Sequence, residues 1–222
     1  MITGKNLARL AGAGAAATIA VGLLSTGAAH ADTFVPLPGG EIVKTLSDGT
    51  VVTVRLAGES ATISSSMGAT PVHRNAWVSG SAQIELSGAD TGASAGIFPG
   101  YTVGCQANIA GGGVNGGAAA SVDTEGSVSP SASSGGSLSL GPGQAQSFYV
   151  LDLERPDGYG NESHKTYNWL SRSTGSVTWS DETIGLSGCG GYAQARAFVS
   201  VEVITDSVTT WITLWGQPFS LG

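Results

Sequence analysis

The chain has little charge and few of the residue patterns that build helices. Asp, Glu, Lys and Arg together make up only 11% of its 222 residues. Runs of Leu, Glu and Lys, which favour helices, are missing, whereas Gly, Thr, Ser and Val are plentiful. This composition predicts an all-β protein with many turns.

Positive charge is especially scarce. Lys5 and Arg9 lie in the first 31 residues, so the remainder has 7 Lys and Arg against 16 Asp and Glu, a net charge of −9. No Lys or Arg occurs between Arg74 and Arg155. Because an acidic surface repels phosphate backbones, we expect no nucleic-acid partner.

The sequence also lacks the motifs of common catalytic and cofactor sites. We find no P-loop and no zinc-ligand spacing. Asp157 and Glu162 lie near His164, but a solvated loop explains this group more simply than a metal site. The carboxylate pair Asp152 and Glu154 has no second catalytic partner. We therefore expect no enzyme, cofactor or metal.

The first 31 residues have the organisation of a secretory signal. Lys5 and Arg9 form a basic start, Leu10–Leu24 is an uncharged apolar run, and Ala29-His30-Ala31 supplies a small-x-small cleavage site. The apolar run is shorter than the roughly 20 residues that a membrane helix needs. We expect cleavage before Asp32 and export of the mature chain.

An exported chain meets an oxidising compartment, which bears on the two cysteines. Cys105 and Cys189 form an even pair, so one disulfide is the favoured interpretation. The alternative is two buried thiols that act as small hydrophobic side chains.

Residues 32–100 and 144–222 alternate between apolar and polar side chains, as half-buried strands do. Two clear examples are the apolar positions of segments 76–86 and 195–203: Ala76, Val78, Ala82, Ile84, Leu86, Ala195, Ala197, Val199, Val201 and Val203. Period-two alternation with turn residues between segments predicts a β-sandwich.

The middle of the chain, residues 101–143, is rich in glycine but keeps the same alternation. Its phase slips by one residue at Gly111–Gly113, as at a β-bulge. We predict one long β-hairpin with two different faces. One face is apolar: Val114, Ala118, Ala120, Val122, Leu138 and Leu140. The other is small and polar and includes Asn115 and Ser121.

A single hairpin with an apolar face cannot enter a membrane alone, because its open edges leave backbone groups unpaired in hydrocarbon. Several subunits must therefore donate hairpins to one closed barrel. A water-filled lumen takes about 16 strands, which means about eight subunits at two strands each. The apolar face would contact lipid, and Asn115 and Ser121 would face the lumen.

Several segments resemble the mycobacterial-type porins, the MspA-like family of mycolic-acid outer membranes. They are the signal ending at Ala31, the block 74–109, the turn Gly141–Gly143, and a C-terminal segment containing Asp206–Thr210 and Gly216–Phe219. The resemblance implies a homo-octameric goblet, with a β-sandwich rim from 32–100 and 144–222 and a stem from 101–143. It also implies passive, cation-favouring diffusion of small hydrophilic solutes.

In that family, acidic residues near the stem tip line the constriction. The matching residues here are Asp123 and Glu125, separated by Thr124 where the family has adjacent acids. Repeated around a ring, they would attract cations. An ordinary solvated turn is the simpler alternative for this stretch.

A different class of function remains open. Under this alternative the chain is a secreted β-sandwich module for binding or adhesion, and the glycine-rich middle is an exposed loop. A channel would produce stepwise conductance in a lipid bilayer, whereas a binding module would not.

Overall fold

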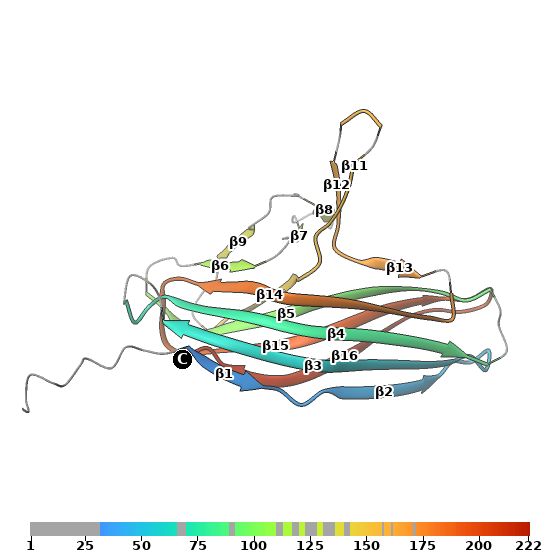
Figure 1. The fold of residues 1–222 in the computed structure, drawn as a ribbon, viewed down its shortest axis with the longest axis horizontal. Coiled ribbons are helices and arrows are strands. Elements are labelled where there is room, and N and C mark those ends of the chain that lie inside the picture. The colour runs from blue at the N-terminus through green and yellow to red at the C-terminus, as the bar shows by residue number, and fades with distance from the viewer. Residues whose placement is uncertain are drawn as a thin grey trace, which may run out of the picture. The chain divides into compact units, whose positions relative to one another are not determined.

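The computed structural model describes residues 32–222, apart from short internal segments: 66–69, 89–91, 110–112, 117–119, 123–127, 131–135, 140–142, 157, 161 and 171. Every element described is a β-strand, and the strands pair antiparallel (Figure 1). The predicted all-β class is therefore confirmed. No described residues form a helix with the length and hydropathy needed to cross a bilayer.

The larger sheet has seven strands. Its order is β1 (Thr33–Pro36), β3 (Val51–Ser65), β4 (Arg74–Ser87), β14 (Thr174–Leu186), β6 (Gly113–Gly116) and β9 (Gly136–Ser139), and β2 (Gly40–Thr45) also pairs with β3. A bulge interrupts β3 between Ala57 and Ser60. Gly58 lies in this bulge with a φ of 62°, a conformation that glycine adopts without steric cost.

The smaller sheet has five strands. Its order is β10 (Ala145–Tyr149), β5 (Ser94–Asn108), β15 (Cys189–Ile204) and β16 (Thr209–Ser220), and β13 (Asn168–Leu170) also pairs with β5. Two short ribbons complete the structure: β7 (Ala120–Val122) with β8 (Val128–Pro130), and β11 (Leu153–Pro156) with β12 (Glu162–Lys165).

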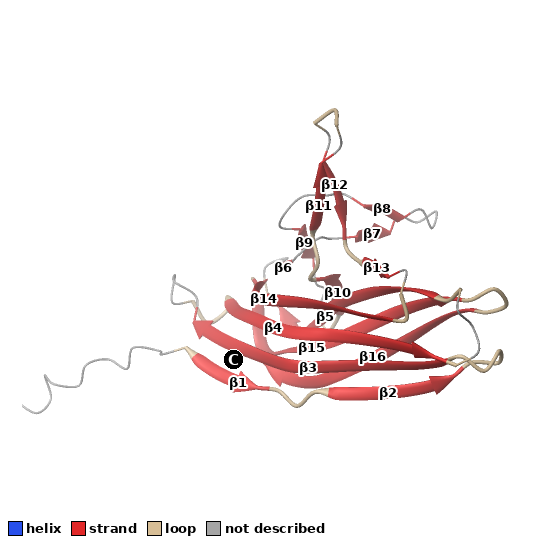
Figure 2. Cartoon of the chain, turned by 45° about the vertical axis from the view of Figure 1, so that its right-hand side comes forward, coloured by secondary structure: helices blue, strands red, loops and turns tan. Residues whose placement is uncertain are grey.

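The two sheets pack face to face around one apolar core (Figures 1 and 2). The apolar positions that the alternation predicted are all buried in it: Ala76, Val78, Ala82, Ile84, Leu86, Ala195, Ala197, Val199, Val201 and Val203. A fully buried Val, Leu or Ile side chain stabilises the fold by about 1.5–3 kcal/mol. The core therefore provides most of the free energy that holds residues 32–222 together.

The sandwich extends further into the middle of the chain than we expected. We placed the start of the stem at residue 101, but β5 continues to Asn108 and pairs with β15 beyond that point. Tyr101 and Val103 are completely buried in the core. The apolar face of residues 101–108 is thus covered by protein and is not available to lipid. The division into rim and stem stays a prediction, and the signal segment 1–31 lies outside the described residues.

Candidate functional site

The central segment forms a series of nested antiparallel pairings. Moving outward from the sandwich, β5 pairs with β10, β6 with β9, and β7 with β8. In the last of these pairs, β7 with β8, Val122 lies opposite Val128, so that only residues 123–127 separate the two legs. The pairings describe one hairpin whose tip lies between Val122 and Val128.

The backbone register of this hairpin places the predicted lipid-facing and lumen-facing residues at alternating positions. In β6 and β9, Val114 lies opposite Leu138, and Asn115 lies opposite Ser137. Directly opposed residues of an antiparallel pair share one face, whereas neighbours along a strand alternate. Val114 and Leu138, both predicted to contact lipid, thus occupy register positions on one face.

In β7, the predicted lumen-facing residue Ser121 stands between Ala120 and Val122, both predicted to face lipid. The orientation of these side chains stays a prediction. Four further predicted residues lie outside the described residues: Ala118, Leu140 and the two proposed constriction residues, Asp123 and Glu125.

The two legs of the hairpin differ in length near the glycine-rich stretch. The outgoing leg advances nine residues from Gly104 to Gly113, while the returning leg advances six from Ala145 to Ser139. We predicted a bulge at Gly111–Gly113, within the sequence of the outgoing leg. Residues 110–112 lie outside the described residues, so the bulge itself stays a prediction.

The root of the hairpin is fixed to the sandwich at Cys105. The Cys105 amide donates a hydrogen bond to the Gln144 carbonyl at 3.3 Å, and the Gly143 amide donates to the Cys105 carbonyl at 3.2 Å. Cys105 also forms a disulfide with Cys189 in β15, with Cα atoms 5.9 Å apart. Both legs and the neighbouring strand β15 therefore meet at one covalent crosslink.

The outer face of the five-stranded sheet carries exposed aromatic side chains. Around Phe98, the ring centroids of Tyr149, Tyr167 and Trp211 lie 6.1, 4.9 and 5.0 Å away. Trp211 and Trp215 on β16 are 53% and 45% exposed. We call these five residues the aromatic face. Exposed apolar patches rimmed by polar residues mark interaction surfaces.

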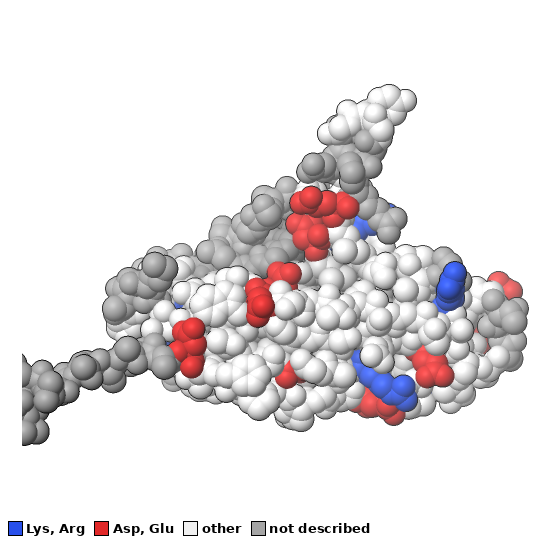
Figure 3. All heavy atoms as spheres, viewed as in Figure 1, with Lys and Arg blue, Asp and Glu red and all other residues white. Residues whose placement is uncertain are grey.

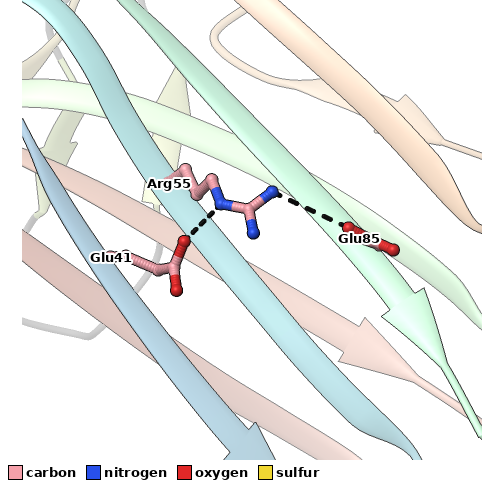
Figure 4. Close-up of polar contacts among 3 residues, drawn as sticks. All are labelled: Glu41, Arg55 and Glu85. Atoms are coloured by element: carbon pink, nitrogen blue, oxygen red, sulfur yellow. Dashed lines mark hydrogen bonds and ion pairs between the residues drawn. The ribbon is translucent and has the colours of Figure 1, made fainter.

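On the seven-stranded sheet, an exposed arginine joins two carboxylates from neighbouring strands. Arg55 of β3 donates a hydrogen bond through Nε to Glu41 of β2, and its Nη1 lies 3.8 Å from Oε2 of Glu85 in β4 (Figure 4). All three side chains are about half exposed, so water and salt screen their attraction. This group supports the strand register weakly and carries no evident chemistry.

One ionisable side chain is buried in the sandwich. Glu59 of β3 is 2% exposed, and neither of its carboxylate oxygens has a hydrogen-bond partner among the described residues. Gly216 of β16 leaves room for it, because a Cβ at that position would lie 2.7 Å from Glu59 Oε2. Burial raises the pKa of Glu59 to about 7. No pattern in the sequence indicates a special role for this residue.

The ribbon of β11 and β12 brings together three side chains that are separated in the sequence. Glu154 lies directly opposite His164, and Asp152 precedes Glu154 by two residues. His164 Nδ1 lies 2.7 Å from Asp152 Oδ1. Nearby, burial and then the charge of Asp152 raise the pKa of Glu182 in β14. Acidic side chains gather near this ribbon on the face seen in Figure 3.

The sequence alone places His164 near Asp157 and Glu162 instead. Asp157 lies outside the described residues. The ribbon register, which places Glu154 opposite His164, could have been inferred from the sequence only by assuming that the turn is centred near residue 159.

Comparison with known proteins agrees with the motifs. No curated protein matches the chain. A sequence model of the MspA family, however, matches residues 48–220, which confirms the predicted resemblance. This family consists of porins rather than enzymes. A match of this length, across the sandwich and the hairpin alike, shows that the chain belongs to the MspA family of porins.

Proposed function

We propose that this chain is one subunit of an oligomeric, water-filled channel in a bacterial outer membrane of the mycolic-acid type. Small hydrophilic solutes and ions cross it by passive diffusion, with a preference for cations. The observation that carries the proposal is the central hairpin of a porin-family chain, with its nested pairings and its single tip.

The length of the hairpin suits a membrane strand. From Gly113, where β6 begins, to Val122, where β7 ends, the outgoing leg counts ten residues. A spanning strand needs about 9–11 residues. The two-faced register of β6 and β9 also fits a wall with lipid on one side and water on the other.

One hairpin does not close a barrel, so the proposal requires other copies of the chain. Each unpaired N–H or C=O group in hydrocarbon costs several kcal/mol, which forbids open edges. About 16 strands are needed for a water-filled lumen, and two strands from each subunit give about eight subunits. The homo-octamer implied by the family resemblance has the same size.

The aromatic face supports self-association of the sandwich. Phe98, Tyr149, Tyr167, Trp211 and Trp215 lie on the outer side of the five-stranded sheet, and the two tryptophans are about half exposed in the single chain. Aromatic residues are enriched where subunits contact each other. In a ring of identical chains, each sandwich has neighbours that would cover such a face.

The proposed cation preference depends on the tip of the hairpin. Asp123 and Glu125 belong to the five residues between β7 and β8. Eight copies would place 16 carboxylates around the lumen, and rings of carboxylates favour cations. The scarcity of Lys and Arg between Arg74 and Arg155 leaves this charge without neighbouring positive residues in the sequence.

Planar bilayer recording of the detergent-purified chain tests the proposal. We expect stepwise conductance and a reversal potential in a salt gradient that favours cations. The double variant Asp123→Asn/Glu125→Gln should keep the conductance steps but move the reversal potential toward zero. Asp181→Asn/Glu202→Gln removes the same charge from the sandwich and serves as the matched control.

The outcomes separate the parts of the proposal. A monomer that never passes current would contradict the channel and favour a secreted binding module. Channels whose reversal potential is unchanged by Asp123→Asn/Glu125→Gln would retain the porin but reject these residues as its selectivity filter. An equal shift of the reversal potential in the control variant would mean that the overall charge of the protein determines its ion selectivity.

A further inference from the structure

The ribbon of β11 and β12 has a side-chain cluster that the proposed channel does not use. Its three members are Asp152, Glu154 and His164, and one donor atom from each lies within 4.8 Å of the other two. The register explains the convergence. Glu154 and His164 are directly opposed, and Asp152, two residues before Glu154, projects to the same side.

Two of the three side chains are partly shielded from solvent, and Glu154 is exposed. The side chains of His164 and Asp152 are 18% and 26% exposed and lie in contact, with Nδ1 and Oδ1 2.7 Å apart. A short, paired ribbon thus holds an imidazole and a carboxylate in a fixed relation, with a second carboxylate beside them.

We propose that Asp152, Glu154 and His164 bind a divalent transition-metal ion of the zinc class. From the sequence alone we expect no metal, because Asp152 and Glu154 are separated from His164 along the chain. The structure supplies one nitrogen and two oxygen donors from three positions on adjoining backbone segments. Three protein ligands and one water complete a tetrahedral zinc site.

The donor set decides between classes of metal. Calcium and magnesium prefer six or more oxygen ligands, whereas an imidazole nitrogen suits zinc, copper or nickel. Zinc bonds of about 2.0–2.2 Å to nitrogen and oxygen place tetrahedral ligands about 3.4 Å apart. The donor atoms, all within 4.8 Å of one another, need only small side-chain rotations to reach that spacing.

Calorimetric titration of the full chain in detergent with Zn²⁺, after dialysis against a chelator and in the presence of excess Mg²⁺, tests the site. We expect one Zn²⁺ per chain. Even groups that only support metal ligands affect affinity by about 10–100-fold, so His164→Ala and Asp152→Asn should each weaken binding at least tenfold. Asp152→Asn is nearly isosteric and keeps the ribbon intact if His164→Ala perturbs its folding.

His73→Ala is the matched control, because it removes an exposed histidine outside the cluster. It should bind Zn²⁺ as the wild type does. In addition, Co²⁺ should give visible absorption bands of a tetrahedral site, and Asp152→Asn should lose them. Absence of saturable binding, or equal binding by wild type and Asp152→Asn, would overturn the proposal. Binding is measured without any current, so the result is independent of whether the chain forms a channel.

Discussion

The sandwich and the central hairpin differ in how much of their strand pairing and burial comes from the chain itself. In the sandwich, β5 and β15 are 15 and 16 residues long, have strand neighbours on both sides and bury one face in the core. In the hairpin, β6 to β9 have only three or four residues each. β6 and β9 extend the seven-stranded sheet at its edge, where β6 pairs with β14 at only two positions, and β7 and β8 pair with each other.

This contrast indicates that one region stabilises itself and the other depends on neighbours. A short two-stranded ribbon is marginally stable in water. It gains stability when more strands or a covering surface are added, and a barrel of several chains would provide both. The sandwich should therefore fold without the hairpin, whereas the hairpin should function only in an assembly.

Removal of the hairpin should have the largest effect. We expect a chain in which a short Gly-Ser linker replaces residues 110–142 to keep its β-sheet circular dichroism and to lose all channel conductance. A short linker suffices because Gly143 and Gln144 already hydrogen-bond to Cys105 at the hairpin root. Melting curves followed by circular dichroism and bilayer recordings of the same preparation measure the two properties.

The matched control replaces residues 158–160, the described part of the turn between β11 and β12, with an equally flexible linker. It should retain conductance. If the chain without its hairpin does not fold, the sandwich is not self-sufficient. If that chain still passes current, the pore lies elsewhere in the molecule.

The disulfide provides the next largest effect and links the two regions. Cys105 and Cys189 are 84 residues apart, and the loop they close contains the entire hairpin. A crosslink over a loop of that length stabilises a fold by about 4.6 kcal/mol in the chain-entropy description, and the measured range is about 2–5 kcal/mol. The variant Cys105→Ala/Cys189→Ala should lose free energy of unfolding in this range in urea titrations.

Reduction of the wild type provides an internal comparison for that variant. The reduced wild type and the double variant should unfold at similar urea concentrations, both below the oxidised wild type. Complete labelling of both thiols in unfolded, unreduced protein would refute the crosslink. An unchanged midpoint in the double variant would mean that the bond adds no stability.

The sandwich could be predicted from the sequence because its alternation is regular. Positions such as Val78 and Val199 follow period two within an uninterrupted strand, and both are buried. The extent of β5, which continues to Asn108 in the sandwich, could not be predicted for a related reason. Alternation identifies an apolar face at Tyr101, but it does not tell whether protein or lipid covers that face.

Two features could not be predicted: the burial of Glu59, which follows an irregular strand, and the side-chain cluster, which depends on strand register. Residues 52, 54 and 56 of β3 are buried, so simple alternation would place Glu59 outside. The bulge at Gly58 reverses the phase and turns Glu59 into the core. The cluster of Asp152, Glu154 and His164 depends on the register of a ribbon, which its turn sets.

The buried carboxyl group of Glu59 should produce the smallest of these effects, and one confined to the sandwich. Its pKa is raised from 4.5 to about 7, because burial without a hydrogen-bond partner disfavours the charged form. Between these two pH values the folded chain keeps the proton and the unfolded chain releases it. This group therefore contributes stability that is complete below about pH 4.5 and is lost as the pH rises through about 7.

The loss at pH 8 amounts to about 3 kcal/mol, from about 1.4 kcal/mol for each pKa unit. Glu59→Gln removes the titration, so its free energy of unfolding should exceed that of the wild type at pH 8 and approach it at pH 4. Urea titrations across this range measure the difference between the two chains, in which the other acidic groups cancel. Glu85→Gln, on the solvent side of β4, is the control, and its free energy of unfolding should change with pH as that of the wild type does. If the free energy of unfolding of Glu59→Gln also changes with pH as that of the wild type does, the Glu59 carboxyl group is hydrated in the folded sandwich. Water then reaches this part of the core.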